Sequence, residues 1–372
     1  MISHAHYDHA RGFEFPVQRK YSTKETLEIY EVDSGHKVGN WLQARYGRRL
    51  KIGEVEVETH AAGHVLGSAQ YEIITPEGNV VYASHINFTD TLLSRAAEVA
   101  PCDLLIVEST YPSTSRSIPR ESVVADIVKW ALECIKDHRI PAFVTDPIGD
   151  AQELIRIFNL WTEIPVIVHP RIARVSEVYE SNGISLRYLD ASTDEATKTI
   201  EQARCMVIVP RRFDTTRYGN FRTAHVSGWA TKYDDDSQKA FPLTAQADLN
   251  QLLQFVEEAR PKAVLTFYGA SGLFAQMVSK RLGISATQLT TERIRRKPQA
   301  TKVDEKRVLA IQEILIRFME TSGFTYEKRD VMTLGLREGF RSTEIEEALL
   351  RLTKIGKLKY SQIVDGYTVP SA

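Results

Sequence analysis

The feature that most constrains the fold of this sequence is a dense cluster of metal-ligand residues at its beginning. His4, His6, Asp8 and His9 fall within six residues. Histidines at alternate positions of a tight loop can both turn onto one cation, and the following Asp–His pair can reach a second cation beside it. Imidazole and carboxylate suit zinc, and manganese or iron less well. Such a loop needs a strand behind it to hold it, and the cluster predicts a metal site on this loop.

Two other interpretations of this cluster are a solvent-exposed polar loop and an expression tag. Histidines of a tag run together, whereas here they alternate with Ala5, Tyr7 and Asp8. A pair of ions about 3.5–4 Å apart can clamp the attacking and leaving oxygens of a phosphodiester. The cluster therefore favours a hydrolytic metal centre.

Composition indicates an ordinary globular chain of two or three domains. Its 372 residues have a formal net charge of -1, so any contact with nucleic acid must come from local basic patches. The three cysteines are far apart and lack CxxC spacing, which argues against a disulfide framework and favours a reducing cytoplasm. No apolar run approaches the roughly 20 residues that cross a bilayer. We expect a cytoplasmic protein without membrane contact.

The patterns of helix and strand signals change along the chain. Helices are expected near 24–30 and 38–46, followed by strands at 55–58, 71–74, 80–82 and 104–107. From about residue 113, helices alternate with buried strands such as 142–144, 166–168 and 206–209, which predicts a parallel sheet flanked by helices. The sheet of the first part is expected to resume near 224–229, with a helix at 249–259 and a strand at 263–267. Three helices and a hairpin after residue 308 suggest a winged helix-turn-helix.

Several segments resemble motifs of the metallo-β-lactamase superfamily, in particular its β-CASP nucleases. Residues 3–12 resemble the HxHxDH signature, residues 62–69 the motif that adds a histidine to the first metal, and residues 107–111 the acidic motif that introduces the β-CASP insertion. Residues 227–229, 242–248 and 265–269 resemble the return from that insertion. The arrangement is similar to ligase-associated DNA exonucleases, Artemis-like nucleases and archaeal mRNA 3′-end processing factor-like proteins.

The resemblance implies an α/β fold: a metallo-β-lactamase αββα sandwich with an inserted β-CASP α/β domain. It implies metallo-β-lactamase parts at 1–112 and 224–290 and the insertion at 113–223. A basic linker at 291–307 and a winged helix at 308–372 then follow. Carried over to this sequence, His4, His6 and His64 would hold one zinc ion, and Asp8 and His9 a second. Asp8 and Glu108 would be catalytic, and the alternative for Glu108 is a strand-end carboxylate that caps a turn.

Four features depart from the family pattern. His85 stands where the family has an aspartate that bridges both metals. A histidine can ligate, so His85 is a candidate ligand in support of the second ion, but a neutral imidazole usually binds one metal through one nitrogen and does not reproduce the bridging charge. Gln246 replaces a histidine that is the family's proton donor, which would remove a factor of roughly 10²–10⁴ in rate. Tyr268 replaces a histidine ligand of RNA-processing members. In the family, a hairpin and a further motif precede the HxHxDH signature, whereas this sequence begins at Met1. We therefore expect that an N-terminal segment is missing.

Basic residues in the linker and the tail are candidates for nucleic-acid contact. They are Arg295, Arg296 and Lys297 in the linker and Arg351, Lys354 and Lys357 in the tail. A solvated linker is the simpler interpretation of the first group. Glutamates at the start of the third tail helix argue against base-specific contacts, so the winged helix is as well suited to a protein partner as to DNA.

Two functions follow from these observations. The first is a metal-dependent nuclease-family phosphodiesterase that acts on DNA or RNA, with one or two Zn²⁺ ions (or Mn²⁺) and a metal-activated water as nucleophile. The second is a catalytically inactive member that binds nucleic acid or a partner protein, because a fold alone does not certify chemistry. A hydrolase of small esters is disfavoured by the insertion and the tail.

Overall fold

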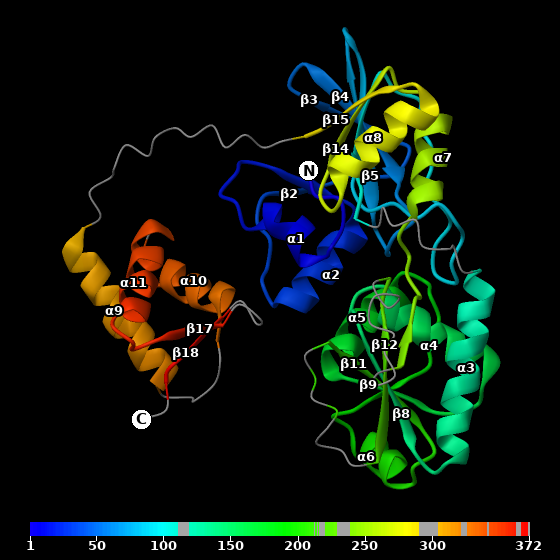
Figure 1. Ribbon diagram of the computed structural model, residues 1–372, viewed down its shortest axis with the longest axis vertical. Helices are drawn as coiled ribbons and strands as arrows, with labels where there is room; N and C mark the ends of the chain where they lie inside the picture. Colours follow the sequence, from blue (N-terminus) through cyan, green and yellow to red (C-terminus); the bar gives the residue numbers. More distant parts are fainter. Residues whose placement is uncertain are drawn as a thin grey trace. The chain divides into compact units, whose positions relative to one another are not determined.

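The computed structural model describes residues 1–110, 119–211, 213, 215, 220–228, 239–289, 304–320, 326–340, 342–361 and 366–370. The chain divides into two compact units, Met1–Thr290 and Thr291–Ala372. Sheets and helices occur in both, so the protein is a mixed α/β chain with several sheets (Figure 1). Among the described residues, no helix is both long enough and apolar enough to cross a membrane.

A mixed seven-stranded sheet organises one part of the first unit, in the order β15-β14-β7-β6-β5-β4-β3. Its strands are β3 (Arg49–Ile52), β4 (Val55–Ala61), β5 (Ala69–Thr75), β6 (Gly78–Ala83), β7 (Leu104–Glu108), β14 (Ala263–Phe267) and β15 (Ser285–Gln288). Neighbours from β3 to β6 are antiparallel, and those from β6 to β15 are parallel. The strands expected at 55–58, 71–74, 80–82, 104–107 and 263–267 are thereby confirmed.

Helices α7 (Leu249–Ala259) and α8 (Ser271–Leu282) cover this sheet (Figure 1). Phe255 and Phe274 are fully buried in one cluster with Leu105 of β7. Helix α7 begins at a capping box, in which the Asp248 carboxylate accepts from the backbone N–H of Gln251 at 2.9 Å. The apolar sides of α7 and α8 therefore bury one face of the sheet.

The N-terminal segment contains α1 (Tyr7–Ala10), a 3-10 turn (Arg11–Phe13), β1 (Lys20–Ser22), α2 (Lys24–Ser34) and β2 (Trp41–Gln43). The helix expected over 38–46 is wrong, because this segment forms β2, which pairs in parallel with β1. Asn40 has a left-handed φ of 56°, which interrupts a helix, and the Trp41 indole donates to the Ser22 hydroxyl at 2.8 Å. Within the described residues, β1 and β2 form a separate two-stranded sheet.

A fully parallel six-stranded sheet, in the order β10-β9-β11-β8-β12-β13, organises the remainder of the first unit. Its strands are β8 (Ile140–Thr145), β9 (Val166–Val168), β10 (Leu189–Asp190), β11 (Met206–Pro210), β12 (Phe221–Val226) and β13 (Lys239–Phe241). Its helices are α3 (Arg120–Lys136), α4 (Asp150–Trp161), α5 (Pro170–Ser181) and α6 (Asp194–Glu201). Phe143 packs among residues of α3, α4 and α5, whereas Ile140 and Val144 join a cluster with Ala196 of α6. The predicted parallel sheet flanked by helices is confirmed.

The sequence placed the return to the first sheet too early. Residues from 224 onward were expected to resume that sheet, but β12 pairs with β8, with Phe221 opposite Ile140, and β13 extends the same sheet. The chain rejoins the seven-stranded sheet only at β14. An apolar strand signal does not specify its partner strand, because pairing is decided by contacts far apart in the chain.

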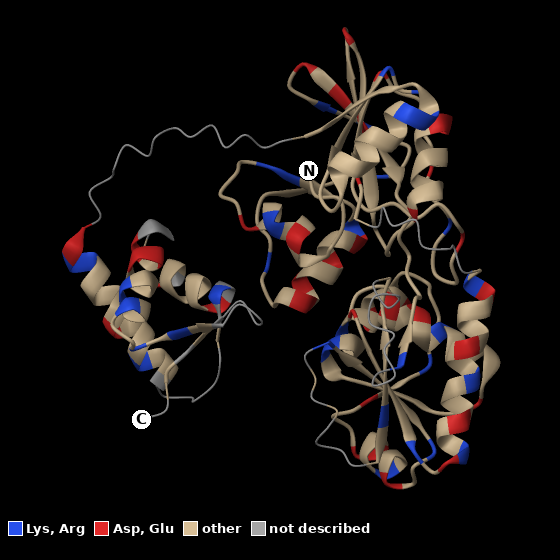
Figure 2. Ribbon diagram, viewed as in Figure 1, with Lys and Arg blue, Asp and Glu red and all other residues tan. Residues whose placement is uncertain are grey.

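The second unit contains α9 (Glu305–Glu320), β16 (Tyr326–Glu327), α10 (Lys328–Arg337), α11 (Ser342–Lys354), β17 (Lys359–Ser361) and β18 (Gly366–Thr368). Its three strands form an antiparallel sheet in the order β16-β18-β17. Apolar residues of the three helices share one core that includes Ile311, Val331 and Leu349. Along α11, glutamates come first and Arg351 and Lys354 come last (Figure 2).

Candidate metal centre

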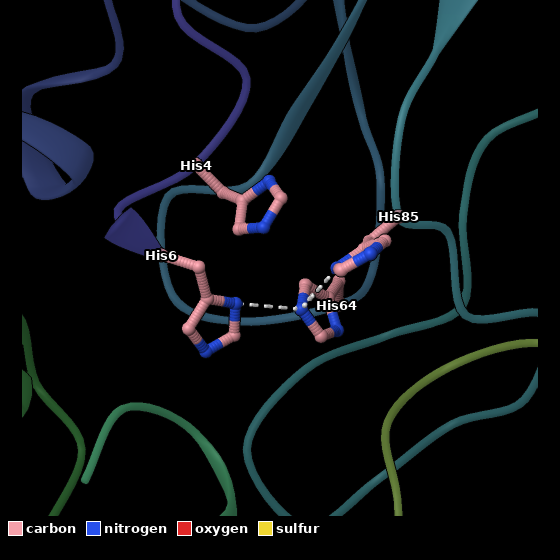
Figure 3. Close-up of side chains that lie close together, drawn as sticks. All are labelled: His4, His6, His64 and His85. Carbon is pink, nitrogen blue, oxygen red and sulfur yellow. Dashed lines mark hydrogen bonds between the residues drawn. The ribbon is translucent and has the colours of Figure 1, made fainter. Parts of the chain in front are cut away.

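Four histidines that are far apart in the sequence gather around one point (Figure 3). His4 precedes α1, His6 is its N-cap, His64 lies in the loop between β4 and β5, and His85 follows β6. Each can offer one ring nitrogen such that all four nitrogens lie within 4.8 Å of one another. The structure thus brings together His4, His6 and His64, as the sequence predicted, and places the candidate ligand His85 with this group.

The loop that carries His64 is held by close backbone packing. Gly67 has φ +79°, and its carbonyl accepts hydrogen bonds from the Thr23 and Thr26 hydroxyls at 2.6 and 2.8 Å. The Ser68 hydroxyl accepts from the backbone N–H of His64 at 3.0 Å. These contacts fix the loop against the start of α2, so the His64 ring has a defined position.

Hydrogen bonds indicate which nitrogens of these rings carry protons. The His64 Nδ1 lies 2.7 Å from the Ala245 carbonyl, and the His6 Nε2 lies 3.1 Å from the Ile148 carbonyl. A carbonyl only accepts, so these nitrogens donate. In the neutral rings, the other nitrogens, His6 Nδ1 and His64 Nε2, then carry lone pairs, and they are 3.1 Å apart. Two facing lone pairs repel each other unless a cation or a proton lies between them.

The electrostatics of the four rings separate His6 from the others. Burial lowers the pKa values of His4 and His64 well below the usual value, and neighbouring histidines lower them further. Burial also lowers the pKa of His85, although its hydrogen bond to Glu108 opposes this shift. Burial opposes protonation of His6 too, but the Asp146 carboxylate raises its pKa to about 9. A metal ion and a proton therefore compete for the Nδ1 of His6.

One orphaned atom tests whether these residues fit a metal ion. The Nε2 of His4 is buried and, within the described chain, has no hydrogen-bond partner. An unpaired buried nitrogen is costly, and most such groups find a partner. A cation among imidazole nitrogens would satisfy it, and imidazole is a preferred ligand of zinc. The donor set fits a metal ion.

A second group lies beside the first: His9, His85 and Glu108 each offer a ligand atom, all within 4.8 Å of one another, and Asp8 lies next to His9. The His9 Nε2 is 3.4 Å from an Asp8 carboxylate oxygen and 3.8 Å from Glu108 Oε2, and it is also buried without a hydrogen-bond partner in the described chain. Burial alone would raise the pKa of Asp8, but the neighbouring His9 ring lowers the pKa below the usual value. Burial also opposes ionisation of Glu108, yet the hydrogen bond with His85 lowers its pKa, so it is an anion near neutral pH.

Glu108 is fully engaged by neighbouring donors. Its Oε1 lies 2.7 Å from His85 Nε2 and 2.5 Å from the Thr110 hydroxyl, and its Oε2 accepts from the Ser84 hydroxyl at 3.1 Å. Sequence reasoning left open whether Glu108 is catalytic or caps a turn. Its contacts give it a third role, because it orients the His85 ring.

Gln246 and Tyr268, which replace histidines of the family pattern, both contact candidate metal ligands. The Gln246 Nε2 is 2.7 Å from His85 Nδ1, and the Tyr268 hydroxyl donates to an Asp8 carboxylate oxygen at 3.4 Å. Tyr268 has a left-handed φ of 62° and is 55% exposed, so its ring stands at the rim of the site. Burial and the neighbouring Asp8 raise the pKa of Tyr268, so the phenol keeps its proton.

Sequence reasoning missed Asp146, which lies 3.5 Å from His6 Nε2. It follows β8 directly, and polar residues just beyond the carboxyl end of a parallel strand often line a site. Its position directly after a buried strand was the available signal, but no motif around Asp146 indicated a site.

The structure describes only some of the residues that were predicted to contact nucleic acid. Arg295, Arg296 and Lys297 lie outside the described residues. Arg351 binds both carboxylate oxygens of Glu305 at 2.7 and 2.9 Å and Glu347 at 2.8 Å, so a phosphate would compete with these ion pairs, and its contact with nucleic acid stays a prediction. Lys354 and Lys357 are exposed.

Comparisons with known proteins support the resemblance seen in the motifs. The chain is 32% identical over 241 residues to a probable DNA ligase of Opitutus terrae, covering 60% of this chain and 22% of the ligase. It is 27% identical over 210 residues to an RNase J-like protein of Methanocaldococcus jannaschii, covering 49% of each chain. It is 33% identical over 219 residues to Integrator complex subunit 11 of Gallus gallus, covering 50% of this chain and 35% of the subunit. No family profile matches the chain.

These relatives confirm that the chain is related to the β-CASP metallo-β-lactamase nucleases. The matched region spans 22% and 49% of the first two relatives, so it corresponds to less than half of either protein. A crystal structure of a protein of unknown function from Enterococcus faecalis V583 superposes with a TM-score of 0.57 at 16% identity. It covers 78% of this chain and 79% of that chain, and supports the fold alone.

Proposed function

We propose that this chain is a metal-dependent, nuclease-family phosphodiesterase that acts on DNA or RNA, with hydrolysis weakened by its substitutions. The observation that carries this proposal is the convergence of ring nitrogens of His4, His6 and His64 beside the Asp8–His9 pair. These are the positions at which the resemblance expects metal ligands. The names of two relatives, RNase J-like and probable DNA ligase, are consistent with nucleic acid as the substrate class.

His4, His6 and His64 would hold a zinc ion, with manganese as the alternative, and Asp8 and His9 are the candidates for a second ion. Such an ion polarises a phosphoryl oxygen and acidifies water. Asp8, whose side chain is 47% exposed, is placed to accept a hydrogen bond from an incoming water and to orient it. Tyr268 donates to Asp8 and keeps that carboxylate oriented toward the open side of the site.

Leaving-group protonation is the step for which this chain lacks a group. An amide at Gln246 does not transfer a proton, and loss of general-acid help costs about 10²–10⁴ in rate. The missing proton donor and the histidine in place of a bridging aspartate at position 85 favour the second candidate function, an inactive member that binds nucleic acid or a partner protein. The three unpaired cysteines are consistent with a cytoplasmic location under either function.

We further propose that the first unit is a metallo-β-lactamase sandwich with a β-CASP insertion, and that the second is a winged helix. Three helices and a three-stranded antiparallel sheet support the latter. Lys354 and Lys357, exposed near the end of α11, are the candidates for phosphate contact. Residues 304–372 should then retard a DNA duplex at low salt, whereas a protein-binding role predicts no retardation.

A metal analysis and a nuclease assay test the main proposal. We expect the purified chain to retain zinc or manganese, and to cleave single-stranded DNA or RNA slowly when that metal is present. His6→Ala should lose both properties, while the control His138→Asp, in an exposed loop, should keep them. Absence of both metals from the wild type would refute the metal centre. Retained metal without cleavage would leave the binding member as the function.

A further inference from the structure

The position of His85 points to a type of metal site that the family pattern does not contain. We propose that His85 is the fourth nitrogen ligand of the ion held by His4, His6 and His64, so that the centre binds one ion in a closed four-imidazole cage. This inference rests on the metal centre of the proposed function. It goes further, because it assigns the number of ions and the ligand that fills the last position.

Distances between ring nitrogens agree with a shared tetrahedral ion. Zinc–nitrogen bonds of 2.0–2.1 Å place the corners of a regular tetrahedron about 3.3–3.4 Å apart. The His64 Nε2 lies 3.1 Å from His6 Nδ1 and 3.3 Å from His85 Nδ1 (Figure 3). His4 offers a nitrogen within 4.8 Å of the other three. Small rotations of buried rings would equalise these distances.

The remaining ring nitrogens are all bound to oxygen atoms outside the cluster. A metal-ligating histidine almost always uses its other ring nitrogen for such a hydrogen bond, often to a carboxylate. The four partners are the Ser3 hydroxyl at 3.1 Å from His4, the Ile148 carbonyl at 3.1 Å from His6, the Ala245 carbonyl at 2.7 Å from His64 and the Glu108 carboxylate at 2.7 Å from His85. His85 therefore has the same pattern as the three expected ligands, and its Nδ1 is the nitrogen that faces inward.

The same contacts disfavour a second ion. A bridging carboxylate would share its negative charge between two ions, whereas the neutral ring of His85 binds one ion through one nitrogen. Asp8 and His9 would remain as ligands of a second ion, with Glu108 as the third. Glu108 already accepts from His85, Ser84 and Thr110. Coordination by Glu108 would cost at least one of these hydrogen bonds, so the second position stays below saturation at zinc concentrations that fill the first.

Gln246 is the group that competes with the ion for His85. Its amide donates to His85 Nδ1 at 2.7 Å, so it must turn away when an ion binds that nitrogen. The Gln246 Oε1 is buried and has no partner in the described chain, so turning breaks only one hydrogen bond. Once four imidazoles surround the ion, a water must displace one of them or bind as a fifth ligand, which gives a physical reason for weak hydrolysis.

Metal stoichiometry and cobalt spectra of the full chain test this inference. After saturation with Zn²⁺ and desalting, we expect one ion per wild-type chain and two per His85→Asp chain, because aspartate can bridge. With Co²⁺, the wild type should show the intense visible bands of four-coordinate cobalt, and His85→Ala should shift them. Glu108→Gln, which acts through His85, should weaken zinc binding by about 10–100-fold without removing a ligand. His138→Asp is the matched control.

Two results would overturn the four-imidazole cage. One is a wild-type chain that retains two ions, and the other is a His85→Ala chain with an unchanged cobalt spectrum. Either result leaves the proposed nuclease function intact. A wild-type chain without any bound metal would instead remove the metal centre itself, so the failures of the two proposals are distinguishable.

Discussion

Replacing Gly67 with alanine tests whether the His64 loop is positioned by its close approach to α2. Gly67 has φ +79°, and a Cβ atom there would lie 2.6 Å from the backbone nitrogen of Thr26 and 2.8 Å from the Thr23 hydroxyl. The left-handed conformation costs an L-residue about 1–2 kcal/mol. Overpacking against backbone adds about 1–3 kcal/mol. We therefore expect Gly67→Ala to lower the free energy of unfolding by about 2–5 kcal/mol.

Gly53 provides the matched control for this substitution. It has φ +63°, and a Cβ atom there would meet nothing within 4 Å. Gly53→Ala should therefore cost only the conformational contribution of about 1–2 kcal/mol. Urea unfolding of both variants measures the difference, provided that their m values agree. Gly67→Ala should also weaken zinc binding, because the loop has to move. Equal destabilisation of the two variants, with unchanged zinc affinity, would refute the reasoning.

Further consequences of the structure can be measured with single substitutions. Phe143→Ala should lower the free energy of unfolding by about 3–5 kcal/mol, whereas Leu132→Ala, at a position 46% exposed, should change it by less than about 1 kcal/mol in the same urea experiment. Gln246→Ala should tighten zinc binding roughly 2–13-fold in a chelator competition, because it removes one competing hydrogen bond of about 0.5–1.5 kcal/mol; weaker binding would contradict this account. Zinc at 100 times its dissociation constant for the wild type should raise the free energy of unfolding of the wild type by about 2.7 kcal/mol and that of His6→Ala by less at the same concentration, because one ligand is lost. If the second unit binds DNA, Lys354→Ala should reduce the salt dependence of binding by about one charge, and an unchanged slope would exclude a phosphate contact there.

The sequence alone determined the local features of this protein. Alternating His4 and His6 followed by Asp8–His9 are near neighbours in the chain, so their chemistry could be inferred without a fold. Helices such as Leu249–Ala259 and strands such as Ala263–Phe267 were predicted at their observed bounds, because apolar periodicity and capping residues are local signals. The helix expected at 38–46 failed where pairing with β1 and the left-handed Asn40 outweighed an ambiguous apolar pattern.

Only the tertiary structure decided which residues share the metal centre and in what role. His64, His85 and Gln246 meet across long stretches of chain, and no local pattern encodes the 2.7 Å contact between Gln246 and His85. The sequence could report that His85 replaces an aspartate, but not that its Nδ1 faces the other three rings while Glu108 holds its Nε2. It also assigned β12 to the wrong sheet. The physical reason is the same in each case: strand pairing and ring orientation are fixed by non-local packing, which a linear pattern does not contain.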